Sequence, residues 1–225
     1  MSSCKQCIAR QLNAMNTLTK EEMKQVAACK TTRFYKKGDV IFNENEMLNG
    51  VYCVREGLCK LTKLSANGKD HTIKLMGKGD LIGQRSIISN ERTNLSAIAL
   101  NDMELCYVPK EQIISTIKTN QEFSFDILQN LAQDLREAED DLINMAQKTV
   151  RERLAATIIY VSKNFGVDKE GYLKVHLSRE DYASIVGTAT ESAIRILSQF
   201  KKEGLISTSG KRIKIENLKD LARVE

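Results

Sequence analysis

The chain has 225 residues, a hydrophobic fraction of 42% and a formal net charge of +5, which allow two modest domains with a core each. No apolar run approaches the roughly 20 residues that span a bilayer, and residues 1–7 lack the apolar core of a signal peptide. We therefore expect a cytoplasmic protein without a membrane partner, whose six cysteines are reduced thiols or metal ligands rather than disulfides.

The first half of the chain changes from a short helix to many short strands. Residues 17–29 predict a helix that is capped by Thr17 or Thr19. From residue 33 to 109, short apolar or alternating runs are separated by glycines, and Asn67-Gly68 is a hairpin-turn signal. Many short strands at close spacing predict an antiparallel β-barrel or jelly roll.

From residue 111 onward the apolar residues follow a helical period. The members of one apolar seam are spaced by three and four residues: Leu128, Leu131, Leu135, Ala138, Leu142 and Met145. Acidic and basic residues lie between them, so the helix has one narrow apolar stripe that needs a partner. The partner can be a second copy of the chain, the barrel of the same chain, or both, with the barrel against one flank.

The last third of the chain is basic, with 14 Lys and Arg against 10 Asp and Glu in residues 149–225. A new helix is predicted from about Thr149 to about Phe165, with a domain boundary at 146–150. A Ser209-Gly210 turn followed by alternating residues predicts a two-stranded wing. The basic excess favours a polyanionic partner, although a solvated basic surface would give the same count.

Residues 177–206 have the pattern of two short helices joined at Gly187. Thr188 and Glu191 match a T-x-x-E capping box, which predicts the start of the second helix. On that helix, Ala193, Ile196, Leu197 and Phe200 share one side, and mostly polar residues share the other. This pattern predicts a helix-turn-helix whose second helix enters the DNA major groove.

The polar side of the second helix carries groups that can read bases. Glu191 and Arg195 are four residues apart and share a face, Arg can bond guanine O6 and N7, and Glu can accept from cytosine N4. Ile194 is apolar on the same side, which suits a thymine methyl group. The alternative is an ordinary surface ion pair. Candidate contacts in and before this helix are Thr188, Thr190, Glu191, Ile194 and Arg195; candidate phosphate contacts are Thr149, Ser178, Arg179, Lys201, Lys211 and Arg212.

A barrel, a long helix and a helix-turn-helix with Glu-x-x-x-Arg together resemble the CRP/FNR family of bacterial transcription regulators. The segments 150-VRERLA-155 and 177-LSREDYASIVGTATESAIRILSQFKKEGLI-206 carry the resemblance, which covers nearly the whole chain. It implies an α+β fold, with a cyclic-nucleotide-binding-type β-barrel (jelly roll), a long dimerisation helix and a C-terminal winged helix-turn-helix. The implied domains are an N-terminal tail with a CxxC motif (1–16), a barrel sensor domain (17–120), the dimerisation helix (121–147) and the DNA-binding domain (148–225). By resemblance, Glu191 and Arg195 fall on base-reading positions.

The resemblance also implies an effector pocket in the stretch 83-GQRSIISNERTNLSA-97. The pocket candidates are Gly83, Gln84, Arg85, Arg92 and Thr93. Gln84 stands where the family has the carboxylate that accepts from a ribose hydroxyl, so that charge-assisted bond is missing and cyclic AMP is not expected. Another anionic ligand, or a pocket that has lost its ligand, stays open.

The cysteines offer a second kind of sensor. Cys4, Cys7 and Cys106 resemble iron–sulfur ligands of the FNR branch, whose cluster takes four thiolates, but Asn13 stands where a further cysteine is expected. Cys29, Cys53 or Cys59 could replace it, or Cys53 and Cys59 could be apolar fillers of strands. Cys4 and Cys7 could instead bind zinc, form a reversible disulfide or have no role.

Together these patterns predict a homodimeric, sequence-specific DNA-binding transcription regulator that is not an enzyme. Its partners are double-stranded DNA, a second copy of itself and RNA polymerase, and a signal of unknown identity acts through the barrel. The alternative function is a thiol-redox or ligand-binding module without base readout. A thiol oxidoreductase usually has its CxxC at the start of a helix in a βαβ unit, and this sequence predicts no such unit.

Overall fold

The computed structural model describes residues 8–65, 68 and 70–224, so Cys4 and Cys7 lie outside the described residues. The chain divides into two compact units: unit 1 contains residues 1–68 and 73–136, and unit 2 contains residues 69–72 and 137–225. Within the described residues, no helix is both long enough and apolar enough to cross a membrane.

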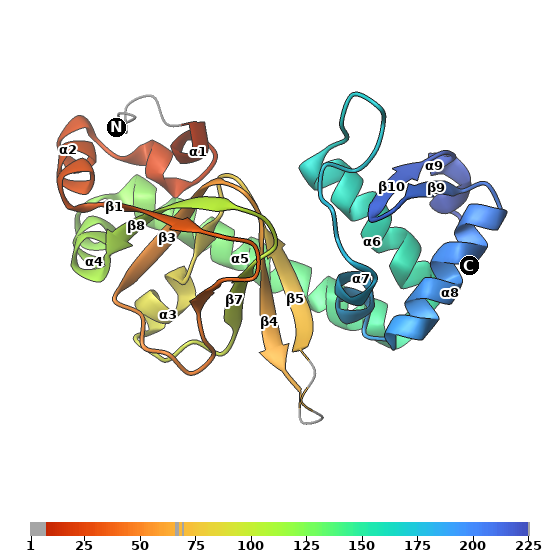
Figure 1. Cartoon of the computed structure of the whole chain (residues 1–225). Helices are drawn as coiled ribbons and strands as arrows, with labels where there is room; N and C mark the ends of the chain where they lie inside the picture. Colours follow the sequence, from red (N-terminus) through yellow and green to blue (C-terminus); the bar gives the residue numbers. More distant parts are fainter. Residues whose placement is uncertain (1–7, 66–67, 69, 225) are drawn as a thin grey trace. The chain divides into compact units, whose positions relative to one another are not determined.

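Unit 1 is built on two four-stranded sheets, which confirms the predicted jelly-roll class (Figure 1). One sheet has the order β1-β8-β3-β6: Thr31–Tyr35, Met103–Pro109, Gly50–Glu56 and Leu81–Ile82. The other has the order β2-β7-β4-β5: Val40–Phe42, Ser96–Ala99, Cys59–Leu64 and Asp70–Met76. Val54, Leu105, Cys59 and Ala97 belong to one buried cluster drawn from both sheets. The inward-facing side chains of the two sheets therefore form one apolar core.

Short helices pack on the β1-β8-β3-β6 sheet. They are α1 (Ile8–Gln11), the 3-10 helix η2 (Ala14–Thr17), α2 (Lys20–Cys29), α3 (Gln84–Ser89) and α4 (Lys110–Thr119). Helix α1 contacts β3, α2 contacts β8, and α4 contacts both strands (Figure 1). Thr19 caps α2 in a capping box with Glu22, which selects one of the two caps expected from the sequence.

The long helix α5 (Gln121–Gln147) has two kinds of surface. Phe123 and Ile127 are buried in the core of unit 1 and Leu131 packs partly against it. The seam residues Leu135 and Leu142, in contrast, are 62% and 72% exposed. The start of α5 and Leu131 therefore pack on the barrel, while the rest of the seam is exposed in the single chain.

Unit 2 is a bundle of helices with a small hairpin. The elements that follow the end of α5 are α6 (Val150–Phe165), α7 (Arg179–Val186), α8 (Thr190–Lys202), β9 (Ile206–Ser209), β10 (Arg212–Ile215) and α9 (Leu218–Leu221). Leu154, Ile158, Tyr182 and Phe200 are almost fully buried. Strands β9 and β10 pair antiparallel as the predicted wing.

The predicted capping box at Thr188 and Glu191 is wrong. Helix α8 begins at Thr190, its N-cap is Ala189, and no side chain caps it. The reason lies in the turn, because the N–H groups of Gly187 (φ +65°) and Thr188 both donate to Ala183 O at the end of α7. Thr188 therefore belongs to the end of one helix and not to the start of the next.

Candidate nucleic-acid interface

Helix α8 separates its apolar and polar residues cleanly. Ala193, Ile196, Leu197 and Phe200 are buried in unit 2, as the sequence predicts. Glu191, Ile194, Arg195 and Ser198 are exposed, and the Ser198 hydroxyl donates to Ile194 O. Ile194 is 45% exposed although it is apolar. An acid, a base and an aliphatic group therefore share one solvent-facing strip that can meet base edges.

The preceding helix and turn fix the start of α8. Ser178 caps α7, since its hydroxyl donates to the Asp181 carboxylate at 2.7 Å and accepts from Asp181 N at 3.0 Å. Buried Tyr182 then anchors α7 in the core, and burial raises the pKa of its hydroxyl well above the usual range. Gly187 supplies the left-handed residue that ends α7. The two helices are thus joined by a short turn set by local hydrogen bonds.

The wing next to α8 is braced by Arg212. Its Nη2 lies 2.9 Å from an Asp168 oxygen and 2.6 Å from a Glu170 oxygen, and its guanidinium lies over the Tyr172 ring. Burial alone would raise the pKa of Asp168, but hydrogen bonds from Arg212 and two backbone N–H groups hold it below its usual value. Arg212, a candidate phosphate contact, therefore already forms ion pairs with two carboxylates of its own unit.

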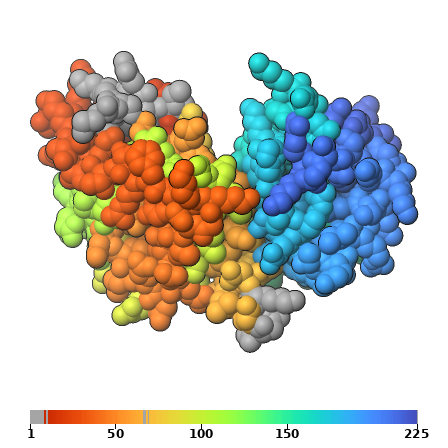
Figure 2. All heavy atoms as spheres, viewed as in Figure 1, coloured from red at the N-terminus to blue at the C-terminus, as the bar shows by residue number. Residues whose placement is uncertain are grey.

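The other phosphate candidates differ in how open they are. Lys201 and Lys211 are exposed, while Thr188 and Thr190 are half-buried. Arg179 donates to Gly210 O at the wing turn, and one of its guanidinium nitrogens is buried. Thr149 caps α6 in a capping box with Glu152. Helix α8 and the hairpin lie next to each other on the surface of this unit (Figure 2).

Sequence reasoning missed Arg153, which joins three segments of unit 2. Its Nε donates to Val186 O at the end of α7 at 3.0 Å. Its Nη1 donates to Lys148 O at 2.6 Å and to Met145 O at 3.4 Å, at the end of α5. The guanidinium therefore meets the carbonyl ends of two helices, where the helix dipole favours a cation. Arg153 is part of the segment VRERLA, but its position in the sequence does not indicate which carbonyl groups it bonds.

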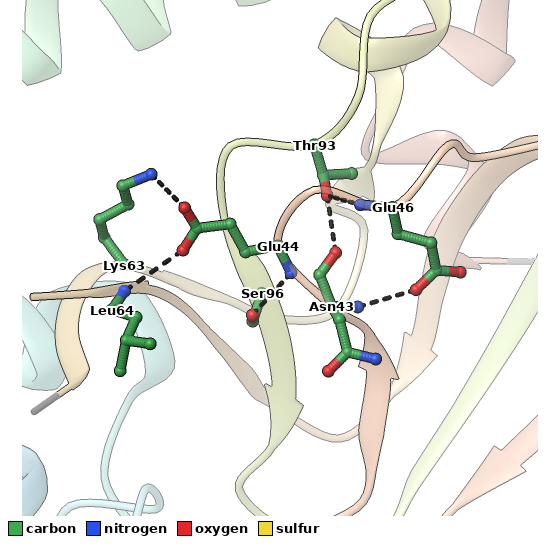
Figure 3. A network of polar contacts seen from close by, with 7 residues as sticks. All are labelled: Asn43, Glu44, Glu46, Lys63, Leu64, Thr93 and Ser96. Atoms are coloured by element: carbon green, nitrogen blue, oxygen red, sulfur yellow. Dashed lines mark hydrogen bonds and ion pairs between the residues drawn. The ribbon is translucent and has the colours of Figure 1, made fainter. Parts of the chain in front are cut away.

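Two of the five effector-pocket candidates, Arg92 and Thr93, are already hydrogen-bonded to the protein. Thr93 donates to Asn43 O and accepts from Glu46 N, and Ser96 accepts from Glu44 N, whose carboxylate pairs with Lys63 (Figure 3). Arg92 donates to Asn45 O. Arg92 and Thr93, which were expected to bind a phosphate, thus bond the backbone of the loop after β2. Gly83 and Gln84 begin α3, where the Gln84 side-chain oxygen is buried without a hydrogen-bond partner, and Arg85 is exposed.

The described residues therefore do not match a cyclic-nucleotide site well. A buried amide stands in place of the ribose-binding carboxylate, and Arg92 and Thr93 bond backbone atoms of residues 43–46. Of the three metal candidates, Cys106 lies on β8 opposite Cys53. No group of three or more potential metal ligands occurs within residues 8–65, 68 and 70–224.

Two family models match the chain and together cover most of it. Residues 32–120 match the cyclic nucleotide-binding domain and residues 152–224 match the Crp-like helix-turn-helix domain. The chain is 26% identical over 191 residues to the CRP-like cAMP-activated global transcriptional regulator of Mycobacterium tuberculosis, covering 84% of this chain and 85% of that protein. It is 25% identical over 226 residues to the fumarate and nitrate reduction regulatory protein of Escherichia coli, covering 98% and 89%.

A solved structure has the same arrangement of elements. FixK2 from Bradyrhizobium japonicum superposes with a TM-score of 0.79 at 25% sequence identity, and the match covers 87% of this chain and 97% of that one. The similarity spans both units. The two family models, the curated relatives and this structure therefore all point to one family.

Proposed function

The chain belongs to the CRP/FNR family of DNA-binding transcription regulators, and on this premise we propose that Glu191, Ile194 and Arg195 of α8 read its target sequence. These three side chains are exposed together, and their chemistry suits cytosine, thymine and guanine edges respectively. Thr190 begins α8, and Thr188 lies in the turn before it. The protein acts by binding DNA and catalyses no reaction.

Phosphate contacts position this helix without specifying sequence. Lys201 and Lys211 are exposed lysines on α8 and at the wing turn, and Arg179 reaches the same turn. Ser178 and Thr149 are further phosphate candidates at the starts of α7 and α6, where their backbone N–H groups donate to the capping-box carboxylates of Asp181 and Glu152. Arg212 contributes through the wing that it braces rather than as a free cation.

A second copy of the chain completes the regulator. The open seam of α5 supplies the dimer contact, because isolated leucines on a long helix are buried by a matching helix. Two α8 helices then read two half-sites about one helical turn apart. A signal received in unit 1 changes the affinity for DNA, the protein acts in the cytoplasm, and RNA polymerase is a further partner.

The observation that carries this proposal is the exposed Glu191-Ile194-Arg195 strip on the side of α8 opposite its buried apolar residues. Selection of bound duplexes from a random pool should enrich a palindromic sequence. Replacement of Arg195 by Ala should weaken binding to that sequence by about 1–3 kcal/mol and relax the preference at one base position per half-site.

The matched control is Arg195→Lys, which keeps the charge but loses the planar fork that bonds guanine at two points. It should relax specificity nearly as much as Arg195→Ala while keeping more of the affinity for non-specific DNA. An equal loss by Arg195→Ala on every sequence would reject base readout by this residue.

A further inference from the structure

The core-facing side of an edge strand in unit 1 carries a charged residue. Arg33 of β1 is the register partner of Leu105 on β8, which in turn is the partner of Val54 on β3. Directly opposed residues point to the same face of a sheet, and Leu105 and Val54 are fully buried. Arg33 is half-buried on that face. A guanidinium directed toward an apolar core costs free energy unless a partner compensates its charge.

Three tyrosines surround this guanidinium. The Arg33 Cζ atom lies 3.9 Å from the centre of the Tyr107 ring and 5.4 Å from the centre of the Tyr52 ring. Burial alone would lower the pKa of Arg33, but a hydrogen bond with Tyr35 and the phenols of Tyr52 and Tyr107 keep it above its ordinary value. Within residues 8–65, 68 and 70–224, the partners of Arg33 are these tyrosines and no carboxylate.

Tyr52 places a second hydrogen-bond donor beside Arg33. Its hydroxyl lies 3.1 Å from Arg33 Nη1, and a guanidinium can only donate, so the Tyr52 oxygen accepts in this bond. In the part of the chain that the structure describes, this hydroxyl has no other hydrogen-bond partner. Burial raises the pKa of Tyr52 to about 12, so the hydroxyl keeps its proton at neutral pH. A buried O–H donor and a guanidinium thus lie together without an acceptor.

Gly50 provides the space in which the Tyr107 ring lies. A Cβ atom at position 50 would come within 2.6 Å of Tyr107 Cζ. Gly50 and Tyr52 are two residues apart on β3 and share a face, so the Tyr107 ring lies across β3 next to the Tyr52 ring, with 5.1 Å between the ring centres. Because Tyr107 covers the flat face of the guanidinium, the N–H edge of Arg33 is the side that a ligand can bond.

We propose that Arg33, Tyr52 and Tyr107 form a binding site for a small organic carboxylate at the β1 edge of the β1-β8-β3-β6 sheet. A carboxylate has two oxygens in one plane, which can accept from the guanidinium edge and from the Tyr52 hydroxyl together. Strand β1 is an edge strand, and Arg33 and Tyr107 are only half-buried, so a small molecule can reach them from solvent. The site uses none of the residues predicted for the effector pocket.

The charges near the site favour a carboxylate over a phosphate. Arg33 supplies one positive charge, while Glu46 acts on Tyr52 and Glu111 acts on Tyr107 as nearby negative charges. A phosphate group carries about 1.5 to 2 negative charges at pH 7, which a single guanidinium does not balance. The tyrosine rings add apolar surface for a short alkyl chain. This inference rests on the proposed function in one respect, namely that unit 1 receives the signal.

The test is a titration of the full-length protein with sodium propionate, followed by tyrosine fluorescence. The chain has six tyrosines and no tryptophan, so the three tyrosines around Arg33 contribute directly to the signal. Sodium phosphate and sodium chloride at equal ionic strength are the comparison salts. Propionate should give a saturable change, phosphate should bind more weakly, and chloride should give no saturable change.

Three variants assign the signal to the site. Arg33→Met removes the charge and should weaken propionate binding at least about tenfold, the size expected for a charge-assisted hydrogen bond. Tyr52→Phe removes one hydroxyl and should weaken binding about three- to tenfold. Lys37→Met is the matched control, because it removes an exposed cation two residues beyond β1, and it should bind propionate like wild type.

Thermal unfolding separates a binding role of Arg33 from a purely structural one. Propionate should raise the unfolding midpoint of wild type, as a ligand of the folded state does, but not that of Arg33→Met. Far-UV circular dichroism checks that each variant folds, and Tyr52→Phe carries the test alone if Arg33→Met does not.

Unchanged propionate affinity in folded Arg33→Met, or in Tyr52→Phe where Arg33→Met does not fold, would overturn the proposal. So would tighter binding of phosphate than of propionate. Binding that is lost in Arg92→Met but kept in Arg33→Met would also overturn it, because propionate would then occupy the predicted effector pocket. The titration uses no DNA, so its failure is separate from a failure of base readout by Arg195.

Discussion

At the scale of single residues, the wing depends on one arginine and two carboxylates. Arg212 sits between Asp168, Glu170 and the Tyr172 ring. Asp168 also accepts from the backbone N–H groups of Glu170 and Tyr172, so it orders the loop as well as the arginine. Arg212 thus joins the wing to the segment that follows α6, in addition to the backbone hydrogen bond from Leu173 N to Ile213 O.

The low pKa of Asp168 predicts a pH dependence of stability. Because its folded-state pKa lies below the ordinary value of 3.8, its carboxylate stabilises the fold above that pH and loses this effect as pH falls through the folded value. Asp168→Asn should therefore lower the urea-unfolding midpoint at pH 7 and have a smaller effect at pH 3.

Glu170→Gln is the graded control for that comparison. Glu170 makes a single ion pair and its side chain is 68% exposed, so its loss should matter less at pH 7. An Asp168→Asn effect of the same size at both pH values would show that its carboxylate charge does not contribute.

The same residues show what a sequence can and cannot tell about a site. Glu191 and Arg195 could be placed on one face because four residues make about one helical turn. Arg212 was expected on DNA because a basic residue in a wing has that role, but its partners are 44 and 42 residues away in the chain. Local periodicity carries no information on such distant pairings.

At the scale of elements, α5 presents an apolar seam that one chain leaves open. Burial of one leucine side chain contributes about 1.5–3 kcal/mol, and each 1.4 kcal/mol is tenfold in affinity. Leu142→Lys should therefore weaken self-association at least tenfold in sedimentation equilibrium. Asp140→Lys, on the exposed polar side of the same turn, should leave it nearly unchanged. A monomeric wild type would contradict the dimer.

Arg153 predicts a second effect at this scale. Arg153→Met removes the donor to Val186 O, Lys148 O and Met145 O, and should cost about 1.5–3 kcal/mol of unfolding free energy, the value for a charged hydrogen bond. Lys163→Met, an exposed change on the same helix, should cost little. Arg153→Lys should recover only part of the loss, since an ammonium lacks the guanidinium's geometry. Equal stability of the Met and wild-type proteins would reject the role.

The strength of the periodic signal decided which elements could be predicted. The long seam of α5 and the apolar side of α8 repeat over several turns, so helices were expected where the structure has them. The start of α8 was misplaced by one residue because T-x-x-E is a short match, and Thr188 instead donates to the end of α7 beside Gly187. The Cys53 and Cys106 pair depends on strand register, which a sequence leaves open.

At the scale of the whole molecule, the proposed dimer predicts a fixed distance between half-sites. Two α8 helices related by a twofold axis meet the same side of DNA only when half-site centres are about 10 base pairs, or a multiple of that, apart. Insertion of about 5 base pairs between the half-sites moves one to the opposite side of the duplex. Affinity in a gel-shift titration should fall to the non-specific level.

Insertion of about 10 base pairs is the control for helical phase, because it returns both half-sites to the same side of the duplex while it increases the distance between them. Tight binding at the 5-base-pair insertion would mean that each half-site is read independently.

The unbroken course of α5 also constrains how this gene can change. A codon gained or lost between Gln121 and Gln147 would turn the residues of α5 beyond the change by about 100° and shift them by about 1.5 Å along the helix. The leucines beyond the change would leave their common stripe. Substitutions along α5 therefore keep the spacing of the seam, whereas an insertion or deletion within the helix breaks it.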